Sequence, residues 1–394
     1  MEISALDESG QKVDWWFIYK VPQLGLGGNN GTGNNQNNDS ATGYEYVYYD
    51  STIDANPDPR QRIIAKSNNL INLDQGALDR TLDSVFNSHQ HPDPTTGWII
   101  YNDEYPASVG KHDDAAKGHS KGVLAFDTET KTGYWLLHSW PKYIDPEATT
   151  YPTPKYGQTY LCISLDLDSI NKIAALMVNH QEPQIYDCNI ADIPKEADQP
   201  LYVLTQPLTS SPAPSSTSID LQSAGVNLPA GYGKLPFKVI AKNREWNDDF
   251  WNDLVGPTLG DDMDDETWIR GKIPPIADSD GIHKTFDIKY INLGPLGAHW
   301  AWPETSDHAK WGITLHEQWI CIADINRMVS QRKRGGGGIA FQNTILWSAL
   351  SKTSLVLAPP ATSRTDTAQL IMDTQHPNYE APLKPQQAPG LSSE

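Results

Sequence analysis

The chain has 394 residues, of which 38% are hydrophobic and 13 are tryptophan, so it can build a large aromatic-rich core. Its formal net charge of −19 would repel a polyanion from most of the surface, and a nucleic-acid substrate therefore requires local basic groups or an acidic medium. No run approaches the roughly 18 consecutive apolar residues that a membrane-spanning helix needs, which excludes such a helix.

Apolar runs separated by polar loops mark the first half of the chain. They predict strands at 15–20, at 97–102 and around 156–162. A Gly- and Asn-rich stretch at 25–41 predicts a loop, and apolar residues at helical spacing predict a capped amphipathic helix at 168–179. Together these elements predict a first repeat over residues 1–205.

A second set of similar elements follows a Ser- and Pro-rich stretch at 206–218, which is typical of a linker. Beyond it the sequence predicts three strands and a closing helix, at 237–242, 286–292, 334–340 and 339–350. We expect a second repeat at 219–373. The Pro-rich end at 374–394 lacks any periodicity and predicts a disordered tail.

Two His-x-Lys triplets are the most informative feature of the chain. His119-Ser120-Lys121 and His308-Ala309-Lys310 each follow a predicted strand that ends in Asn, at nearly the same separation. A single triplet is common by chance, but two triplets with the same landmarks in the same order indicate two copies of one α/β unit.

The geometry of a triplet indicates its chemistry. Side chains at i and i+2 of a strand point to the same face, so each copy presents an imidazole and an ammonium together. If the copies pack about a pseudo-twofold axis, both pairs face one cleft and can hold one phosphodiester. One histidine can then attack phosphorus while the other protonates the departing oxygen, and the lysines can stabilise the phosphoryl charge without a metal.

Eight short motifs stand in a fixed order between about residue 9 and about residue 352. They are Val13–Lys20, Ile100–Asp103, Gly118–Leu124, Trp135–Ser139, Tyr156–Thr159, Asp307–Trp311, Asp324–Arg327 and Arg334–Gly337. In this order they resemble deoxyribonuclease II, a divergent branch of the phospholipase D-like superfamily. The resemblance implies a duplicated phospholipase D-like α/β fold, in which two pseudo-twofold-related repeats of sheet and helix share one central active site.

Carried over residue by residue, the resemblance implies a catalytic core of His119, Lys121, His308 and Lys310. Asp127 resembles the Asp that follows the first triplet in the superfamily, although it stands one residue further from Lys121 than usual. Asp324 and Asn326 lie in a stretch similar to the Gly-Ser-x-Asn element, which implies that the Asn326 amide lies beside the phosphate. Both aspartates could equally be ordinary turn or ion-pairing residues.

Four more residues are expected to support the site. His138 resembles a third histidine of the family, with an ordinary buried histidine as the alternative, and Asn102 ends the strand before the first triplet. Gly335 and Gly336 precede the predicted helix at 339–350. Their amides and the helix N-terminus could hold a phosphate, and a flexible loop is the alternative.

The resemblance implies a metal-independent acid endonuclease that hydrolyses DNA through a phosphohistidine and leaves 3′-phosphate and 5′-hydroxyl ends. No cofactor or metal is expected. Double-stranded DNA is the expected partner, and a homodimer would suit a clamp around it. Acid protonates carboxylates and histidines and so reduces repulsion of DNA, and a basic run at 332–334 precedes the glycines.

The family implies secretion or an acidic compartment, although no signal peptide is visible in the sequence. Three cysteines allow at most one disulfide, fewer than in the animal enzymes, and this favours a bacterial member.

Two alternatives stay open. One is a phosphodiesterase of the same fold that acts on RNA or on a phospholipid. The other is a non-catalytic binding protein with a Trp-rich surface, and the two triplets argue against it because binding alone needs neither pair.

Overall fold

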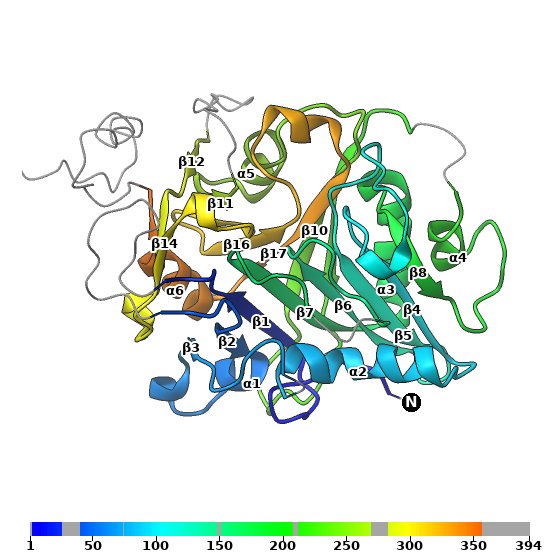
Figure 1. Ribbon diagram of the computed structural model, residues 1–394, viewed down its shortest axis with the longest axis horizontal. Coiled ribbons are helices and arrows are strands. Elements are labelled where there is room, and N and C mark those ends of the chain that lie inside the picture. The colour runs from blue at the N-terminus through cyan, green and yellow to red at the C-terminus, as the bar shows by residue number, and fades with distance from the viewer. Residues whose placement is uncertain are drawn as a thin grey trace, which may run out of the picture.

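The computed structural model describes residues 2–25, 40–73, 75–147, 151–207, 212–268 and 283–356. Two large sheets dominate the molecule, one built from the first half of the chain and one from the second (Figure 1). The mixed α/β class is confirmed, with more strand than helix.

The first sheet has eight strands in the order β3-β2-β1-β7-β6-β5-β4-β8, and each strand is antiparallel to its neighbours. Its strands are β1 (Trp15–Lys20), β2 (Tyr46–Asp50), β3 (Ala65–Lys66), β4 (Thr96–Tyr101), β5 (Gly122–Asp127), β6 (Thr132–His138), β7 (Gln158–Asp166) and β8 (Ile185–Asn189).

The second sheet has seven strands in the order β12-β11-β15-β16-β17-β10-β9. They are β9 (Ser216–Gln222), β10 (Pro236–Lys242), β11 (Met263–Thr267), β12 (Thr285–Asp287), β15 (Lys310–Thr314), β16 (Trp319–Ala323) and β17 (Gly336–Gln342). A small sheet of β14 (Ala301–Pro303), β13 (Tyr290–Asn292) and β18 (Ser354–Leu355) lies beside it.

The helices are short except for α2. They are α1 (Ser51–Asp54), α2 (Ala77–Gln90), α3 (Leu167–Leu176), α4 (Pro200–Leu204), α5 (Gly256–Leu259) and α6 (Thr344–Thr353). Single turns of other helix types are η1 (Pro59–Gln61), η2 (Ala107–Val109), η3 (Met177–Gln181), η4 (Trp251–Val255), η5 (Gly294–Leu296), η6 (Glu304–Ser306) and η7 (Val329–Lys333).

The two large sheets share one strand order. The run β1-β7-β6-β5-β4 in the first sheet has the same sequence order and the same antiparallel pairing as β10-β17-β16-β15-β11 in the second. A helix, α3 or α6, follows the corresponding strand β7 or β17 in each half. Each His-x-Lys triplet therefore leads into the equivalent strand of its own sheet: Lys121 directly precedes β5, and Lys310 is the first residue of β15.

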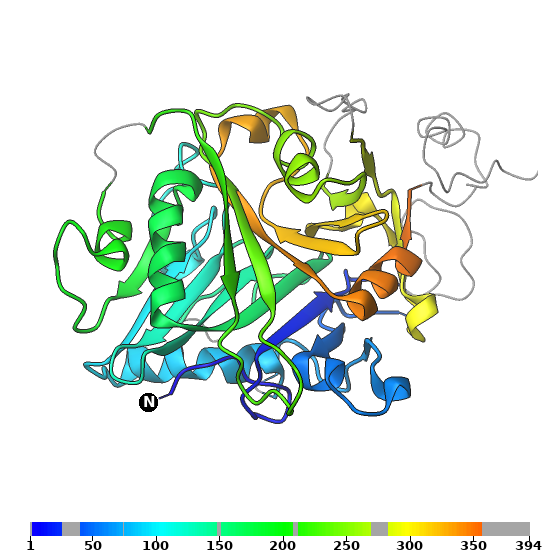
Figure 2. The same ribbon diagram turned by 180° about the vertical axis from the view of Figure 1, so that it is seen from behind.

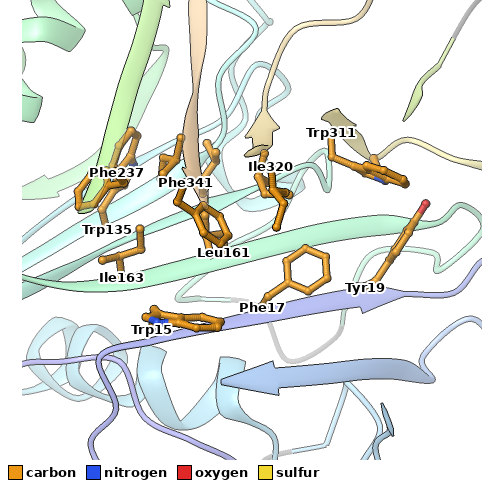
Figure 3. Packing of buried hydrophobic residues seen from close by; sticks show 14 of the residues in the cluster. Trp15, Phe17, Tyr19, Trp135, Leu161, Ile163, Phe237, Trp311, Ile320 and Phe341 are labelled. Atoms are coloured by element: carbon orange, nitrogen blue, oxygen red, sulfur yellow. The ribbon is translucent and has the colours of Figure 1, made fainter. Parts of the chain in front are cut away.

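The core lies mainly between the two sheets. Trp15, Phe17 and Tyr19 of β1 point into it, and they meet side chains of the second sheet such as Phe341 and Trp311 (Figure 3). Helices α3 and α6 contribute to the same cluster and lie on opposite sides of the paired strands β9 and β10 when the molecule is seen from behind (Figure 2). Burying this apolar surface joins the halves into one unit.

A second cluster covers the other face of the first sheet. Because side chains alternate along a strand, Trp16 and Ile18 of β1 point away from the central core and pack against Leu78 and Leu82 of α2. Both faces of β1 are thus buried, which explains why residues 15–19 are all apolar or aromatic.

Two predictions about the elements need correction. The run at 286–292 is split between β12 and β13 in different sheets, and β11 is the strand that pairs with β15 as β4 pairs with β5. The helix predicted at 339–350 begins only at Thr344, since residues 339–342 belong to β17. A short apolar run fits a strand or a buried helix equally well.

The remaining predictions concern the helix of the first half, the linker, the glycine- and asparagine-rich loop and the tail. The helix predicted at 168–179 is α3, capped by Asp166 and extended by η3. The predicted linker at 206–218 overlaps the start of β9 at Ser216. Most of the loop at 25–41 and the whole tail at 374–394 lie outside the described residues.

Candidate active site

The two triplets come from equivalent places in the two sheets. His119 and Lys121 lie directly before β5, and Lys310 begins β15, with His308 two residues before it. The side chains of both lysines are buried, with 2% of each residue exposed. Burying an ammonium is costly unless other groups compensate, so such lysines are expected at functional sites.

Each histidine is held by a glycine from the opposite half of the chain. The His119 amide donates to the Gly335 carbonyl at 2.8 Å, and the His308 amide donates to the Gly157 carbonyl at 2.9 Å. A Cβ atom on Gly157 would lie 2.7 Å from the Asp307 carboxylate, and one on Gly335 would lie 2.5 Å from a carbonyl oxygen, so only glycine permits these contacts. The crossed pattern draws the two triplets toward each other.

Two further lysines anchor the loops that carry these glycines. Lys20, at the end of β1, donates to the carbonyl of Tyr156 at 2.7 Å and to that of Gly43 at 2.7 Å. Lys242, at the end of β10, donates to the carbonyl of Arg334 at 2.6 Å. Both ammonium groups are buried and satisfied by carbonyls, which fixes the loops just before β7 and β17.

The first site is an ionic cluster. His119 Nδ1 lies 2.6 Å from the backbone oxygen of Asp324, and its Nε2 lies 3.2 Å from Oδ2 of Asp103. The other oxygen of Asp103 lies 2.6 Å from the Lys121 ammonium. Because a carbonyl can only accept, Nδ1 carries a proton and Nε2 is the nitrogen that faces the site.

Burial dominates the protonation equilibrium of His119. Burial, and after it the Lys121 ammonium, lowers the pKa of His119 well below its usual value, and Asp103 opposes this only in part. Lys310 of the second half acts in the same direction as Lys121. A neutral ring with its proton on Nδ1 leaves a lone pair on Nε2, as a nucleophile requires.

The second site is aromatic. The His308 ring stacks on Tyr156 with centroids 3.9 Å apart and lies 4.3 Å from the Trp268 ring centroid. The Lys310 ammonium donates to the His308 carbonyl at 2.6 Å. Burial, and next the Lys121 ammonium, lowers the pKa of Lys310 to about 7, so the two lysines repel each other across the halves.

Of the predicted supporting residues, Asp324 and His138 lie near the cationic groups. Burial raises the pKa of Asp324 to about 8, although Lys121 and Lys310 oppose it. Burial lowers the pKa of His138 to about 3, with Lys121 adding to the effect. Asn326, also buried, follows β16 by three positions, and no described group bonds its Oδ1.

Asn102 and Asp127 have structural partners. The Asn102 side chain donates to the carbonyls of Trp140 and Tyr143, so it ties the end of β4 to the loop after β6. Asp127 accepts from Thr95 and Thr130 at the far end of β5 from Lys121. The structure does not bring Asp127 together with the triplets.

The glycine run has a role in packing rather than at a helix terminus. Gly335 supports His119, whereas Gly336 begins strand β17, where a Cβ would lie 2.4 Å from the Ile325 side chain. Helix α6 begins only at Thr344. The predicted helix N-terminus directly after these glycines is therefore wrong.

Comparisons with known proteins bear on the same residues. The family model of deoxyribonuclease II matches residues 4–359. A protein of Burkholderia pseudomallei named "Putative deoxyribonuclease-2" is 54% identical over 377 residues, which cover 96% of this chain and 99% of that protein. The deoxyribonuclease-2-beta of Rattus norvegicus is 30% identical over 358 residues, or 89% of this chain and 90% of that protein. The chain belongs to the deoxyribonuclease II family.

Family membership makes the protein a deoxyribonuclease II-like nuclease, a hydrolase whose substrate is DNA. Among the described residues, no helix is long and apolar enough to cross a membrane. The described residues also contain no group of three or more His, Cys, Asp or Glu side chains that could hold a metal ion. All three cysteines are free thiols.

Sequence reasoning did not single out Asp103 of this candidate active site. Asp103 touches both members of the first pair, yet only its neighbour Asn102 was selected, as the last residue of a strand. The β4–β5 register pairs Tyr101 with Gly122, which brings the residue after Asn102 beside Lys121. The motif Ile100–Asp103 contained the signal, but only the strand pairing reveals it.

Proposed function

We propose that this deoxyribonuclease cuts DNA by a metal-independent, two-step reaction at the junction of its two halves. The proposal rests on one observation above all: two His-Lys pairs with buried lysines, at equivalent strands of the two sheets, are tied crosswise by Gly157 and Gly335. Within it, the two halves are copies of a phospholipase D-like unit with one shared active site, in keeping with their common strand order.

In the first step His119 Nε2 attacks phosphorus, a nitrogen–phosphorus bond forms, and the bond from phosphorus to the 5′ oxygen breaks. His308 supplies the proton that this leaving oxygen needs. Lys121 and Lys310 stabilise the negative charge on the non-bridging oxygens, and the buried amide of Asn326 can donate to the same oxygens.

In the second step water attacks the phosphohistidine while His308 takes the proton from that water. The nitrogen–phosphorus bond breaks, and His119 returns to its neutral form. The products are a 3′-phosphate and a 5′-hydroxyl end. The same imidazole thus serves as acid and then as base, as microscopic reversibility requires.

Acidic pH suits this site for two electrostatic reasons. Lys310, whose pKa burial lowers to about 7, carries its charge below that pH. Asp324, whose pKa burial raises to about 8, stays uncharged there and adds no repulsion to the phosphate. Acid also lowers the overall negative charge of the protein, so approach of DNA becomes easier.

A plasmid-nicking assay tests the proposal. The protein should nick supercoiled plasmid near pH 5 in excess chelator, and His119→Ala or His308→Ala should each reduce the rate by about 10²- to 10⁴-fold. His316→Ala is the matched control, since His316 is exposed and pairs with Asp261. Equal cutting by both site variants and the parent would refute the proposal.

A further inference from the structure

The Asp103 carboxylate has the position that a substrate phosphate would need. One of its oxygens lies 2.6 Å from the Lys121 ammonium and the other lies 3.2 Å from His119 Nε2. Two oxygens of one anion thus bridge the ammonium and the imidazole, as two phosphoryl oxygens would do. Asp103 and Lys121 are 9% and 2% exposed at their side chains, so little space remains for a second anion.

Asp103 contacts Nε2 of His119, whereas a residue that only orients the His119 ring would contact Nδ1. His119 Nδ1 already has its partner, the Asp324 carbonyl at 2.6 Å, and this contact fixes the ring. An orienting carboxylate would occupy Nδ1 and leave Nε2 free for chemistry. Asp103 instead covers Nε2, the nitrogen that must reach phosphorus.

We propose that Asp103 is a built-in competitor of the substrate phosphate, which pairs with His119 and Lys121 itself and must swing away before a phosphodiester can contact them. This inference rests on the proposed function, because it takes His119 and Lys121 as the groups that receive the phosphate.

The main chain around Asp103 is anchored, so a rotation of the side chain is the movement required. The Asn102 amide donates to the Gln184 carbonyl, and the Gln184 side chain donates to the carbonyls of Asn102 and Asp103 at 3.0 and 3.2 Å. The Glu104 amide donates to the Asn102 side chain. No described hydrogen bond other than the two ionic contacts holds the Asp103 carboxylate itself.

The exchange of anions couples phosphate binding to proton uptake. Burial alone would raise the pKa of Asp103, but the Lys121 ammonium and then His119 hold it below its usual range. Arg334 acts likewise, while His138 and Lys310 also sense the Asp103 charge. Once phosphate binds His119 and Lys121, the displaced Asp103 carboxylate lies beside a second anion. Its pKa therefore rises, and it binds a proton more readily. Phosphate should therefore bind more tightly as the pH falls.

Titration calorimetry of the full chain with inorganic phosphate tests this device. At pH 7 Asp103→Asn should bind phosphate about tenfold more tightly than the parent, a change of about 1.4 kcal/mol. At pH 5 the gain should be smaller, because the parent can already protonate the displaced carboxylate. Proton uptake, read from enthalpies in buffers of different ionisation heat, should fall in the variant.

Glu104→Gln is the matched control. It removes the same charge from the neighbouring residue, but Glu104 pairs with exposed Lys142 at 3.5 Å and does not touch the triplet. Its phosphate affinity should stay within about twofold of the parent, since exposed charges are largely screened. If Asp103→Asn does not fold, Asp103→Ser should give the same gain.

Phosphate affinity that is unchanged, lower, or undetectable in every variant would overturn the inference and make Asp103 a positioning residue. This result is distinct from failure of the proposed function. A parent that cuts DNA but shows no Asp103 effect removes the inference alone. A parent that shows the phosphate effect but never nicks plasmid removes the proposed function.

Discussion

The two His-Lys pairs have the same place in their sheets but different surroundings. Around His119 the neighbours are ionic, with Asp103 at one ring nitrogen and the Asp324 carbonyl at the other. Around His308 they are aromatic, with Tyr156 stacked on one side and Trp268 close by. The shared strand order thus sets where the pairs stand, and the loops outside the strands make the two histidines unequal.

These different surroundings suit different catalytic roles for the two histidines. A ring whose Nδ1 proton is fixed by a carbonyl presents a defined lone pair at Nε2, which fits His119 as the nucleophile. A ring that is clamped by stacking can keep its position whether or not it carries a proton, which fits His308 as the acid and base. The comparison can therefore be tested by chemistry that needs only one of the two roles.

The largest expected effect comes from a substrate whose leaving group needs no proton. With bis(p-nitrophenyl) phosphate, His308→Ala should release a burst of about one nitrophenolate per active site and then stall, because step two lacks its base. His119→Ala should lose the burst altogether, at least about 10²-fold in rate. Stopped-flow absorbance at pH 5 measures both.

The control for this experiment is His316→Ala, which should behave as the parent because His316 is exposed and pairs with Asp261. Acid-labile label from a ³²P-labelled substrate should remain on the His308→Ala protein and be absent from His119→Ala. The opposite pattern, with a burst only in His119→Ala, would exchange the roles of the two histidines.

An effect of about one pH unit is expected at Lys310. Because its pKa is about 7, the parent should lose activity as the pH rises through 7. Lys310→Arg keeps its charge to much higher pH, so the alkaline limb should move toward about 8, where Asp324 loses its proton. Rates of plasmid nicking from pH 4 to pH 9 would give both midpoints.

Lys238→Arg provides the control for replacing a lysine with arginine. Lys238 pairs with the exposed Asp220 at 2.7 Å and is remote from the triplets in sequence and strand order. Its variant should keep the parent's alkaline limb. An unshifted limb in Lys310→Arg would mean that another group, and not Lys310, sets the loss of activity.

Patterns local in sequence predicted much of this molecule. The apolar runs at 15–20, 97–102 and 237–242 are β1, β4 and β10 to within one residue at each end, because each is short and apolar and ends at a polar residue. The two triplets stand out in the sequence because each follows a predicted strand that ends in Asn, at nearly the same separation. The assignment to deoxyribonuclease II was confirmed by the family model and the relatives.

Contacts between distant segments could not be predicted in this way. The crossed hydrogen bonds of Gly157 and Gly335 depend on how the sheets pack, and the Asp103 pair depends on the β4–β5 register. Asp127 is an instructive case. A strand rises about 3.3 Å per residue, so a residue at the far end of β5 lies roughly 20 Å from Lys121. The strand pattern alone already argued against grouping them.

The smallest expected effect is on the melting temperature, and it follows from a difference between the buried carboxyl groups of the two halves. In the first half Asp14 accepts from the amides of Gly225 and Val226 and from Ser223. In β11 of the second half, Asp265 and Glu266 have no hydrogen-bond partner among the described residues. Burial raises the pKa of Glu266 well above its usual value, and the nearby Asp307 and Glu304 add to this.

A carboxyl group whose pKa is raised by folding binds more protons in the native state. Its contribution to the free energy of unfolding is complete below the unfolded-state pKa of about 4.3 and is lost as the pH rises toward the native pKa. Glu266→Gln cannot ionise, so it should melt at nearly the parent's temperature at pH 4 and a few degrees higher at pH 7.

Calorimetric melting at both pH values checks this, with exposed Glu147→Gln as a control expected to change neither. Because the charges of Glu266 and Asp307 interact, and Asp307 is the residue just before His308, ionisation of Glu266 would add a second negative charge near the second His-Lys pair. The same acid preference would then appear in stability and in activity for one electrostatic reason. A Glu266→Gln protein that loses stability equally at pH 4 and pH 7 would instead show that the carboxyl group makes a specific stabilising contact that the amide cannot replace.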